Sequence, residues 1–181
     1  QGWQLETTVG GGTYASLTVP YTVAFADNGK RVRYTATNGC GTTNSATVTL
    51  TVNDVTTVAT PATPSAICAG GSYSPATPTV TANGSTVTSQ GWQLETTVGG
   101  GTYASLTVPY TVAFADNGKR VRYTATNGCG TTNSATVTLT INTAASISSQ
   151  PTAQAVCSGS NATFSVTAGG TSPNYAWRKR G

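Results

Sequence analysis

The sequence has no histidine and no methionine, and charged residues make up only 8% of its 181 positions. Without histidine, this chain cannot build a Ser-His-Asp or a Cys-His catalytic arrangement. Glu95 and Asp116 offer two carboxylates of the kind that glycosidases use. One stands at the end of a predicted strand and the other in a turn, so we expect both to be solvated surface residues. We therefore expect a non-enzyme with no catalytic residues.

Signals for a metal, a cofactor or a nucleic acid are missing as well. The four cysteines lack the CxxC spacing and the histidines of a zinc site, and the few acidic residues do not cluster as calcium ligands do. Gly99–Gly101 is not followed by the Lys-Ser/Thr of a phosphate loop. Basic residues at 119–122 alternate with apolar ones, as on a solvated strand face rather than a phosphate track. No apolar run is long enough to span a bilayer, so no membrane insertion is expected.

What the chain does contain is a near-perfect internal repeat. Residues 1–53 recur as residues 90–142 with one change, Val52 to Ile141, so that Gln1 corresponds to Gln90 and the period is 89 residues. Such a duplication indicates a tandem array of one structural unit. We expect a domain's C-terminal half at 1–55, a complete domain at 56–142 and the N-terminal half of a further domain at 143–181.

The two expected halves are complementary, since residues 143–181 lead up to a Trp and residues 1–53 resume at a Trp. Head-to-tail completion between chains, as in strand donation, is therefore one interpretation. We favour the simpler one, a cut-out from a longer covalent chain, with the joint between domains near Asn53 to Pro64.

The residue pattern within one period is typical of short strands. Thr, Ser, Gly, Ala and Val dominate the composition, which suits strands better than helices. Residues 120–125 and 135–141 alternate apolar and polar positions with period two, with Ala135 pointing inward, and short strands are also expected over 110–114 and 162–168. Turns are expected at 99–101 and 127–130, where Gly or Asn interrupts the runs. The sequence predicts an all-β sandwich of about seven strands in two sheets. Its expected core includes Trp92, Val121, Tyr123, Val137 and Leu139.

Trp92 also admits a second interpretation, as a sugar-stacking platform. A Trp on the middle strand of a sandwich is usually the core plug, however, and we expect that role here.

Three segments resemble the bacterial immunoglobulin-like repeats of very large surface and secreted proteins of the Bacteroidota. They are Val156-Cys157-Ser158-Gly159-Ser160-Asn161-Ala162-Thr163-Phe164-Ser165-Val166, the strand Tyr175-Ala176-Trp177-Arg178, and Tyr123-Thr124-Ala125-Thr126-Asn127-Gly128-Cys129-Gly130 running into Ala135 to Ile141. The resemblance spans nearly the whole chain. It implies tandem immunoglobulin-like sandwiches and a surface or secreted protein of adhesin or gliding-motility type.

Cysteine usage favours disulfides and an oxidising, extracellular location. Within the complete domain we expect Cys68 to pair with Cys129, while Cys40 and Cys157 pair outside the sequence given. The competing pattern joins Cys40 to Cys68 and Cys129 to Cys157, which would link neighbouring domains.

The functional hypothesis is a structural stalk or filament repeat of a large cell-surface or secreted adhesin-like protein. Its expected partners are adjacent repeats of the same chain or neighbouring copies in a filament, and surface glycans or a host or substratum reached through regions outside this sequence. The alternative is an accessory carbohydrate-binding module of a secreted multidomain enzyme, which would require exposed aromatics in a line on one face. A noncovalent filament of short subunits is a third possibility.

Overall fold

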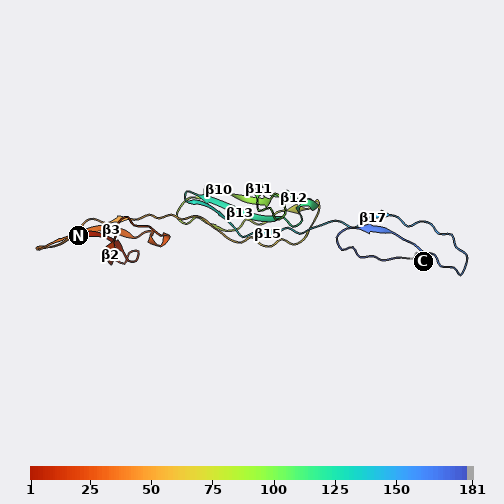
Figure 1. Ribbon diagram of the computed structural model, residues 1–181, viewed down its shortest axis with the longest axis horizontal. Coiled ribbons are helices and arrows are strands. Elements are labelled where there is room, and N and C mark those ends of the chain that lie inside the picture. The colour runs from red at the N-terminus through yellow and green to blue at the C-terminus, as the bar shows by residue number, and fades with distance from the viewer. Residues whose placement is uncertain (179–181) are drawn as a thin grey trace. The chain divides into compact units, whose positions relative to one another are not determined.

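The computed structural model describes residues 1–178, and these residues form an all-β fold with two short 3₁₀-helices. This confirms the predicted fold class, because the strands assemble into several sheets as in a β-sandwich (Figure 1). The Thr- and Val-rich sequence accounts for it, since β-branched side chains pack well on a pleated sheet and disfavour helix.

By its internal contacts the chain divides into two compact units. The first comprises residues 1–58, 79–90 and 125–133, and the second comprises residues 59–78, 91–124 and those from Ser134 onward. The first copy of the repeat lies wholly in the first unit, whereas the second copy contributes to both. The domain boundaries expected from the repeat follow a different division of the chain and stay predictions.

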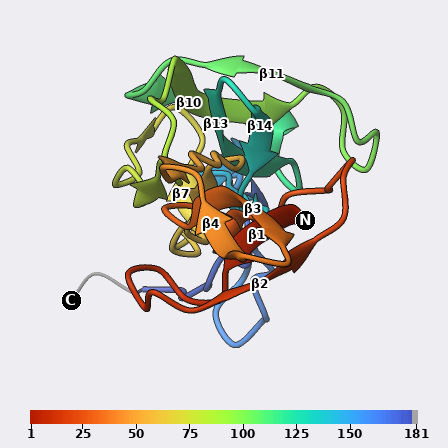
Figure 2. The same ribbon diagram turned by 90° about the vertical axis from the view of Figure 1, so that its left-hand side faces the viewer.

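The first copy of the repeat forms one sheet with the strand order β2-β1-β3-β4, and β5 pairs with the beginning of β3 (Figure 2). Its elements are β1 (Gly2–Glu6), β2 (Tyr14–Leu17), η1 (Phe25–Asp27), β3 (Arg31–Asn38), β4 (Gly41–Asn44) and β5 (Val48–Thr49). All pairings are antiparallel, and the register places Trp3 between Leu17 of β2 and Tyr34 of β3.

The second copy repeats this sheet as β11-β10-β13-β14, with β15 paired to β13. Its elements are β10 (Ser89–Glu95), β11 (Tyr103–Leu106), β12 (Tyr110–Thr111), η2 (Phe114–Asp116), β13 (Arg120–Asn127), β14 (Gly130–Asn133), β15 (Val137–Thr138) and β16 (Ile141–Asn142). Trp92 lies opposite Leu106, as Trp3 does opposite Leu17. The predicted turns at 99–101 and 127–130 are confirmed as the connections of β10 to β11 and of β13 to β14.

Residues 56–82 add short strands to the second copy. β8 (Ser72–Tyr73) pairs antiparallel with β12, and β7 (Ile67–Cys68) pairs in parallel with β16. A further pair joins β6 (Thr57–Val58) to β9 (Val80–Thr81). Residues 21–22 are identical in sequence to β12 but form no strand. Pairing with a partner, not local sequence, therefore makes β12 a strand.

The five side chains expected in the core are all buried. Trp92, Tyr123 and Val137 are 5–6% exposed, and Val121 and Leu139 are at most 1% exposed. The ring of Trp92 makes edge-on contacts with Tyr123 at 5.1 Å and with Tyr73 at 6.5 Å between centroids. Such T-shaped pairs are favourable beyond the apolar area that they bury. Residues 120–127 alternate buried and half-buried positions along β13, as the period-two pattern predicts.

Some expectations are wrong in detail. Ala135, expected inward, is exposed because β15 begins only at Val137. The strand expected over 110–114 ends at Thr111, and the chain then turns into η2. Thr56, expected in the linker, is fully buried and its Oγ1 donates a hydrogen bond to the Ala125 carbonyl at 3.1 Å. The burial of Thr56 depends on this hydrogen bond to a distant carbonyl, which cannot be inferred from the residue type alone.

The C-terminal segment contains one antiparallel pair, β17 (Ser146–Ser149) with β18 (Thr167–Gly169). The strand expected over 162–168 is therefore limited to its last residues. Large apolar side chains of this segment are at least half exposed, namely Ile147, Val156, Phe164, Tyr175 and Trp177.

Candidate functional site

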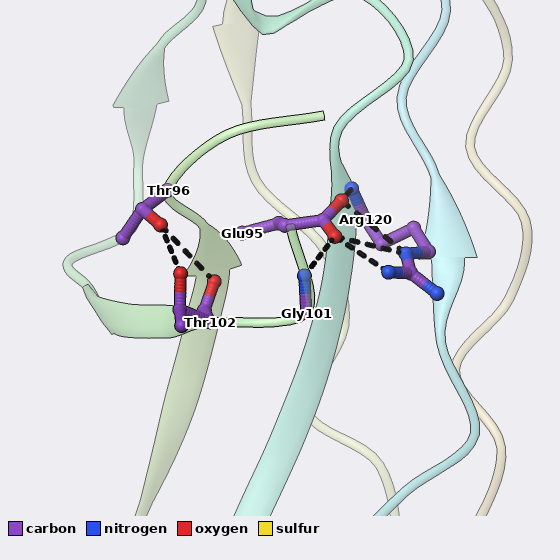
Figure 3. Close-up of polar contacts among 5 residues, drawn as sticks. All are labelled: Glu95, Thr96, Gly101, Thr102 and Arg120. Atoms are coloured by element: carbon purple, nitrogen blue, oxygen red, sulfur yellow. Dashed lines mark hydrogen bonds and ion pairs between the residues drawn. The ribbon is translucent and has the colours of Figure 1, made fainter. Parts of the chain in front are cut away.

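A salt bridge joins Glu95, the last residue of β10, to Arg120, the first residue of β13 (Figure 3). Arg120 Nη2 lies 2.6 Å from Glu95 Oε1, and Arg120 Nε lies 3.2 Å from both carboxylate oxygens. The backbone N–H groups of Arg120 and Gly101 donate to the same carboxylate at 3.1 Å and 3.0 Å. Glu95 is fully buried, and every strong acceptor direction of its carboxylate is occupied.

The environment of Glu95 fixes its charge. The side-chain hydrogen bond from Arg120 and the backbone N–H of Gly101 favour the anion, and together they outweigh burial, so that the pKa of Glu95 is lowered from 4.5 to about 2. A carboxylate held in this way neither releases nor takes up a proton near neutral pH. It acts as a staple between the β10–β11 turn and β13 rather than as a general acid or base.

The turn beside this staple needs its glycines. Gly99 and Gly101 have φ of 72° and 70°, a region that side chains with a Cβ disfavour. Gly100 donates its N–H to the Thr97 carbonyl at 3.0 Å, and a Cβ at position 100 would collide with the Thr97 hydroxyl. The hydroxyls of Thr96 and Thr102 bond across the base of the turn (Figure 3). The Gly run is thus a hairpin turn built to deliver one N–H to Glu95.

A second carboxylate cluster closes η2. Asp116, only 3% exposed, accepts hydrogen bonds from Lys119 Nζ at 2.9 Å, from the Tyr110 hydroxyl at 3.0 Å and from the Ala113 N–H at 2.9 Å. Burial raises the pKa of Asp116, but these hydrogen bonds outweigh it and the net pKa is lowered. The cluster ties the 3₁₀ turn to the strands on either side of it.

The third basic residue of the run also has partners. The Arg122 guanidinium lies over the Tyr103 ring, 3.9 Å from its centroid, and Arg122 Nε donates to Gln93 Oε1 at 2.8 Å. This is a cation–π contact on a row that crosses β11, β10 and β13. The basic run at 119–122 is therefore not a free patch, since all three of its cations have a partner in the second copy.

The first copy reproduces each contact. Arg31 Nη2 lies 2.6 Å from Glu6 Oε1, Lys30 Nζ lies 2.8 Å from Asp27 Oδ1, and Arg33 lies over the Tyr14 ring at 3.8 Å. The pKa of Glu6 is again lowered to about 2, first by Arg31 and then by a backbone N–H. The charged clusters are thus properties of the repeated unit itself.

These findings correct the sequence analysis. Glu95 and Asp116 are not solvated surface residues, because they are at most 3% exposed. They do not act as a carboxylate pair either, since each is neutralised by its own cation. The spacing of Asp116 and Lys119 is a local signal that could have indicated the second pair. The Glu95–Arg120 pair joins residues 25 positions apart, so only the fold brings it together.

A polar cluster that the sequence analysis missed fixes the joint between the repeats. Asn127, 4% exposed at the end of β13, donates from Nδ2 to the Asp54 carbonyl at 2.7 Å and to the Ala82 carbonyl at 3.1 Å. Its Oδ1 accepts the N–H of Cys129 at 3.0 Å. Asn83 Nδ2 donates to the Val55 carbonyl at 2.7 Å. The joint expected near 53–64 is therefore hydrogen-bonded to two turns rather than loose.

The next joint shows a related arrangement. Thr171 donates its backbone N–H to the Thr143 carbonyl at 3.1 Å, and Thr143 donates its N–H to Thr171 Oγ1 at 2.9 Å. In both cases the residues that follow a repeat are bonded to the turn after a short strand, β9 or β18. The residues after the repeat are thus ordered at both positions.

Within residues 1–178 the structure does not contain the disulfides expected from the sequence. Cys40, Cys68, Cys129 and Cys157 are all free and exposed, so neither the expected Cys68–Cys129 disulfide nor the competing pairs are formed. Cys68 is held in β7 by its ladder with β16, and Cys129 is held in the turn after β13 by Asn127. The two residues belong to different units, and each backbone is fixed by partners of its own. Cys129 and Cys157 occupy the positions of Cys40 and Cys68 one 89-residue period later, so the duplication itself accounts for the four positions.

The aromatic side chains of residues 54–142, all of which the structure describes, are mostly enclosed. Trp92, Tyr73 and Tyr123 are buried, and Tyr103 and Tyr110 are half-buried in the contacts described above; Phe114 alone is exposed, at 52%. Trp92 Nε1 and the Tyr73 hydroxyl are buried without a hydrogen-bond partner. Trp92 thus packs as a core plug, and its indole N–H does not face solvent.

Residues 1–178 contain no group of three or more side chains suited to hold a metal ion. Over the same range, no helix is both long and apolar enough to cross a bilayer. No protein-family model matches the chain, and comparison with characterised proteins finds no match.

Proposed function

We propose that this chain is a structural stalk or filament repeat of a large extracellular or cell-surface adhesin-like protein, and that it has no catalytic role. One observation carries the proposal: the charged side chains of the repeated unit serve to hold its own turns and strands together, in the same way in both copies. The ionisable side chains bond to partners within the unit itself, and the unit is duplicated almost unchanged. Both features are more typical of a scaffold than of a reactive site.

The joint supports the same role. A stalk has to transmit force from one repeat to the next, and the carbonyls of Asp54 and Val55 are each bonded to a turn of the neighbouring structure. Asn127 is 4% exposed, so breaking its hydrogen bond to Asp54 would leave a buried polar group without a partner, which costs free energy. An ordered joint limits bending, whereas a Gly- or Ser-rich linker would permit it.

The proposed location rests on the resemblance to immunoglobulin-like repeats of bacterial surface proteins. The argument from disulfides no longer contributes, because the four thiols are free. The proposed partners are adjacent repeats of the same chain or of neighbouring copies. Surface glycans or a substratum would be reached by other regions of the protein.

The test combines mechanical and binding measurements on the chain. In single-molecule pulling we expect a discrete unfolding event for residues 54–142 that lengthens the chain by at most about 300 Å, the extended length of 89 residues. Asn127→Ala should lower the unfolding force, because the Asp54 and Ala82 carbonyls lose their shared donor. The matched control is Asn38→Ala, since Asn38 is the same residue in the first copy and is exposed.

A glycan array distinguishes the scaffold from the alternative, an accessory carbohydrate-binding module. Failure to bind any glycan, together with a clear unfolding event, supports the scaffold. Saturable glycan binding that is lost on substituting Phe114, the exposed aromatic of residues 54–142, would contradict it.

A further inference from the structure

Asparagine is followed directly by glycine at five places in the chain: Asn28-Gly29, Asn38-Gly39, Asn83-Gly84, Asn117-Gly118 and Asn127-Gly128. At such a pair the backbone nitrogen of glycine can attack the side-chain amide carbon of asparagine, because glycine has no side chain that obstructs the approach. The new carbon–nitrogen bond closes a succinimide ring and expels ammonia, and water then opens the ring to aspartate or isoaspartate. The reaction needs no reactant other than water, so the fold decides which of the pairs can react.

In two of the pairs the attacking nitrogen is occupied. The N–H of Gly118 donates to the Leu139 carbonyl at 2.9 Å, and Asn117 Oδ1 accepts the N–H of Ile141 at 2.9 Å. The pair at 28–29 makes the same two bonds in the first copy, at 2.8 Å and 2.9 Å. Ring closure at either pair has to break both bonds first, so both pairs are protected.

The pair Asn127-Gly128 is protected at the side chain instead. Asn127 is 4% exposed, its Nδ2 donates to the carbonyls of Asp54 and Ala82, and its Oδ1 accepts the N–H of Cys129. Turning the amide carbon toward the next nitrogen gives up all three bonds inside the fold, where an unpaired polar group is costly. This asparagine is therefore also held in an unreactive position.

The pair Asn83-Gly84 has neither kind of protection. The N–H of Gly84 has no hydrogen-bond partner within residues 1–178. The side chain of Asn83 makes a single hydrogen bond, from Nδ2 to the Val55 carbonyl at 2.7 Å. Exposure does not make the distinction, because Asn117 is exposed whereas Asn83 is half-buried. The difference lies in the bonding of the two groups that react.

We propose that Asn83 converts spontaneously to aspartate and isoaspartate in the folded chain, in the turn that secures the joint after the first copy. The Asn83 carbonyl accepts the N–H of Asp54 at 3.0 Å, and its side chain holds Val55. An aspartate lacks the Nδ2 donor and sets a carboxylate against the Val55 carbonyl oxygen, so that two acceptors face each other. Isoaspartate also routes the main chain through the former side chain. Either product loosens the joint. The modification goes beyond the scaffold role and does not depend on it.

The test follows the intact chain in mildly alkaline buffer, because the attacking nitrogen reacts after it loses its proton. Trypsin divides the five sites among peptides 1–30, 34–119 and 123–178, and tandem mass spectrometry locates each site at which an acid has replaced an amide. We expect Asn83 to convert at least about tenfold faster than Asn117 and Asn127. Protected sites react only after local opening, and a factor of ten corresponds to an opening free energy of about 1.4 kcal/mol.

Two controls separate the effect of the fold from that of the local sequence. In urea that unfolds the chain, all five sites should convert at similar rates, since each asparagine precedes a glycine. In the folded chain, Asn38 should convert faster than Asn127, although the same residues flank both. The side chain of Asn38 is exposed and accepts one hydrogen bond, from the N–H of Cys40, in place of the three bonds that hold Asn127.

The consequence for the joint is measured on Asn83→Asp, which carries the aspartate product. Hydrogen exchange at the Asp54 N–H should be roughly fivefold faster than in the unaltered chain, because the loss of one hydrogen bond of about 1 kcal/mol gives that factor. The matched control is Asn133→Asp, which should leave this exchange unchanged because Asn133 is exposed. Conversion of Asn83 that is no faster than that of Asn117 and Asn127 in the folded chain would overturn the proposed site, and unchanged exchange in Asn83→Asp would overturn its effect on the joint. The scaffold role stands in either case, since that role fails on glycan binding.

Discussion

Truncating Val112 to alanine is the most direct test of the core of the second copy. Val112 is 1% exposed, and its backbone is held on both sides by hydrogen bonds to Gly70 and Gly71. Two buried carbons at about 0.8 kcal/mol each give about 1.6 kcal/mol. The fixed backbone prevents collapse around the cavity, so we expect a total loss of about 2–3 kcal/mol in the free energy of unfolding.

The loss can be read from urea unfolding followed by Trp92 fluorescence, with Trp3 and Trp177 replaced by Phe. At an m-value of about 2 kcal/mol/M, the midpoint should fall by about 1–1.5 M. The control is Val98→Ala, because Val98 is 60% exposed and belongs to the same unit; its effect should stay within about 0.5 kcal/mol. Equal losses at Val112 and Val98 would refute the assignment of a packed core to this part of the fold.

Three further outcomes are expected. The pKa of Glu95 is about 2 in the fold against an ordinary value of 4.5, so its contribution to stability is complete above pH 4.5 and disappears as the pH falls toward 2; Glu95→Gln should flatten the acid limb of the stability profile in that window, and an unchanged slope would contradict the staple. Gly101→Ala should cost at least about 1 kcal/mol because φ is 70° there, whereas Gly91→Ala, with open space around its Cβ, should not destabilise; a urea titration of both variants compares them, and equal midpoints would speak against a strained turn. A thiol reagent should titrate four cysteines in the folded chain, and two unreactive ones would restore the disulfide.

Much of the fold could be predicted because the repeat states its own pattern twice. Alternation along residues 120–127 indicates which side chains face inward, and the Gly- and Asn-containing turns mark where the strands end. Both signals are local, and the structure follows both. The burial of Trp92 could be predicted in the same way, because exposing a large apolar side chain on a middle strand to water is unfavourable.

The charged contacts could not be predicted from local pattern. An alternating row of Arg and Val has the same appearance whether its cations face water or a carboxylate from another strand. The burial of Glu95 depends on a partner 25 positions away and on one N–H of a glycine turn. Asn127 is a comparable case, because its carbonyl partners come from positions 54 and 82. The cysteines are the opposite case, because the sequence predicts disulfides whereas all four thiols are free and exposed in the structure.

The duplication also separates local from tertiary causes in a way that a single domain does not. Local sequence is the same at Tyr21 and Tyr110, yet only the second lies in a strand, and it is the one that β8 reaches. By contrast, the Glu6–Arg31 and Glu95–Arg120 pairs have the same 2.6 Å contact in both copies. The charged contacts are therefore internal to residues 1–53 and 90–142, and they form in both copies although only the second has its Trp and the following residues buried. Residues 1–53 thus carry the information for the sheet and its ion pairs, whereas the strand at β12 and the burial of Trp92 depend on residues 56–82.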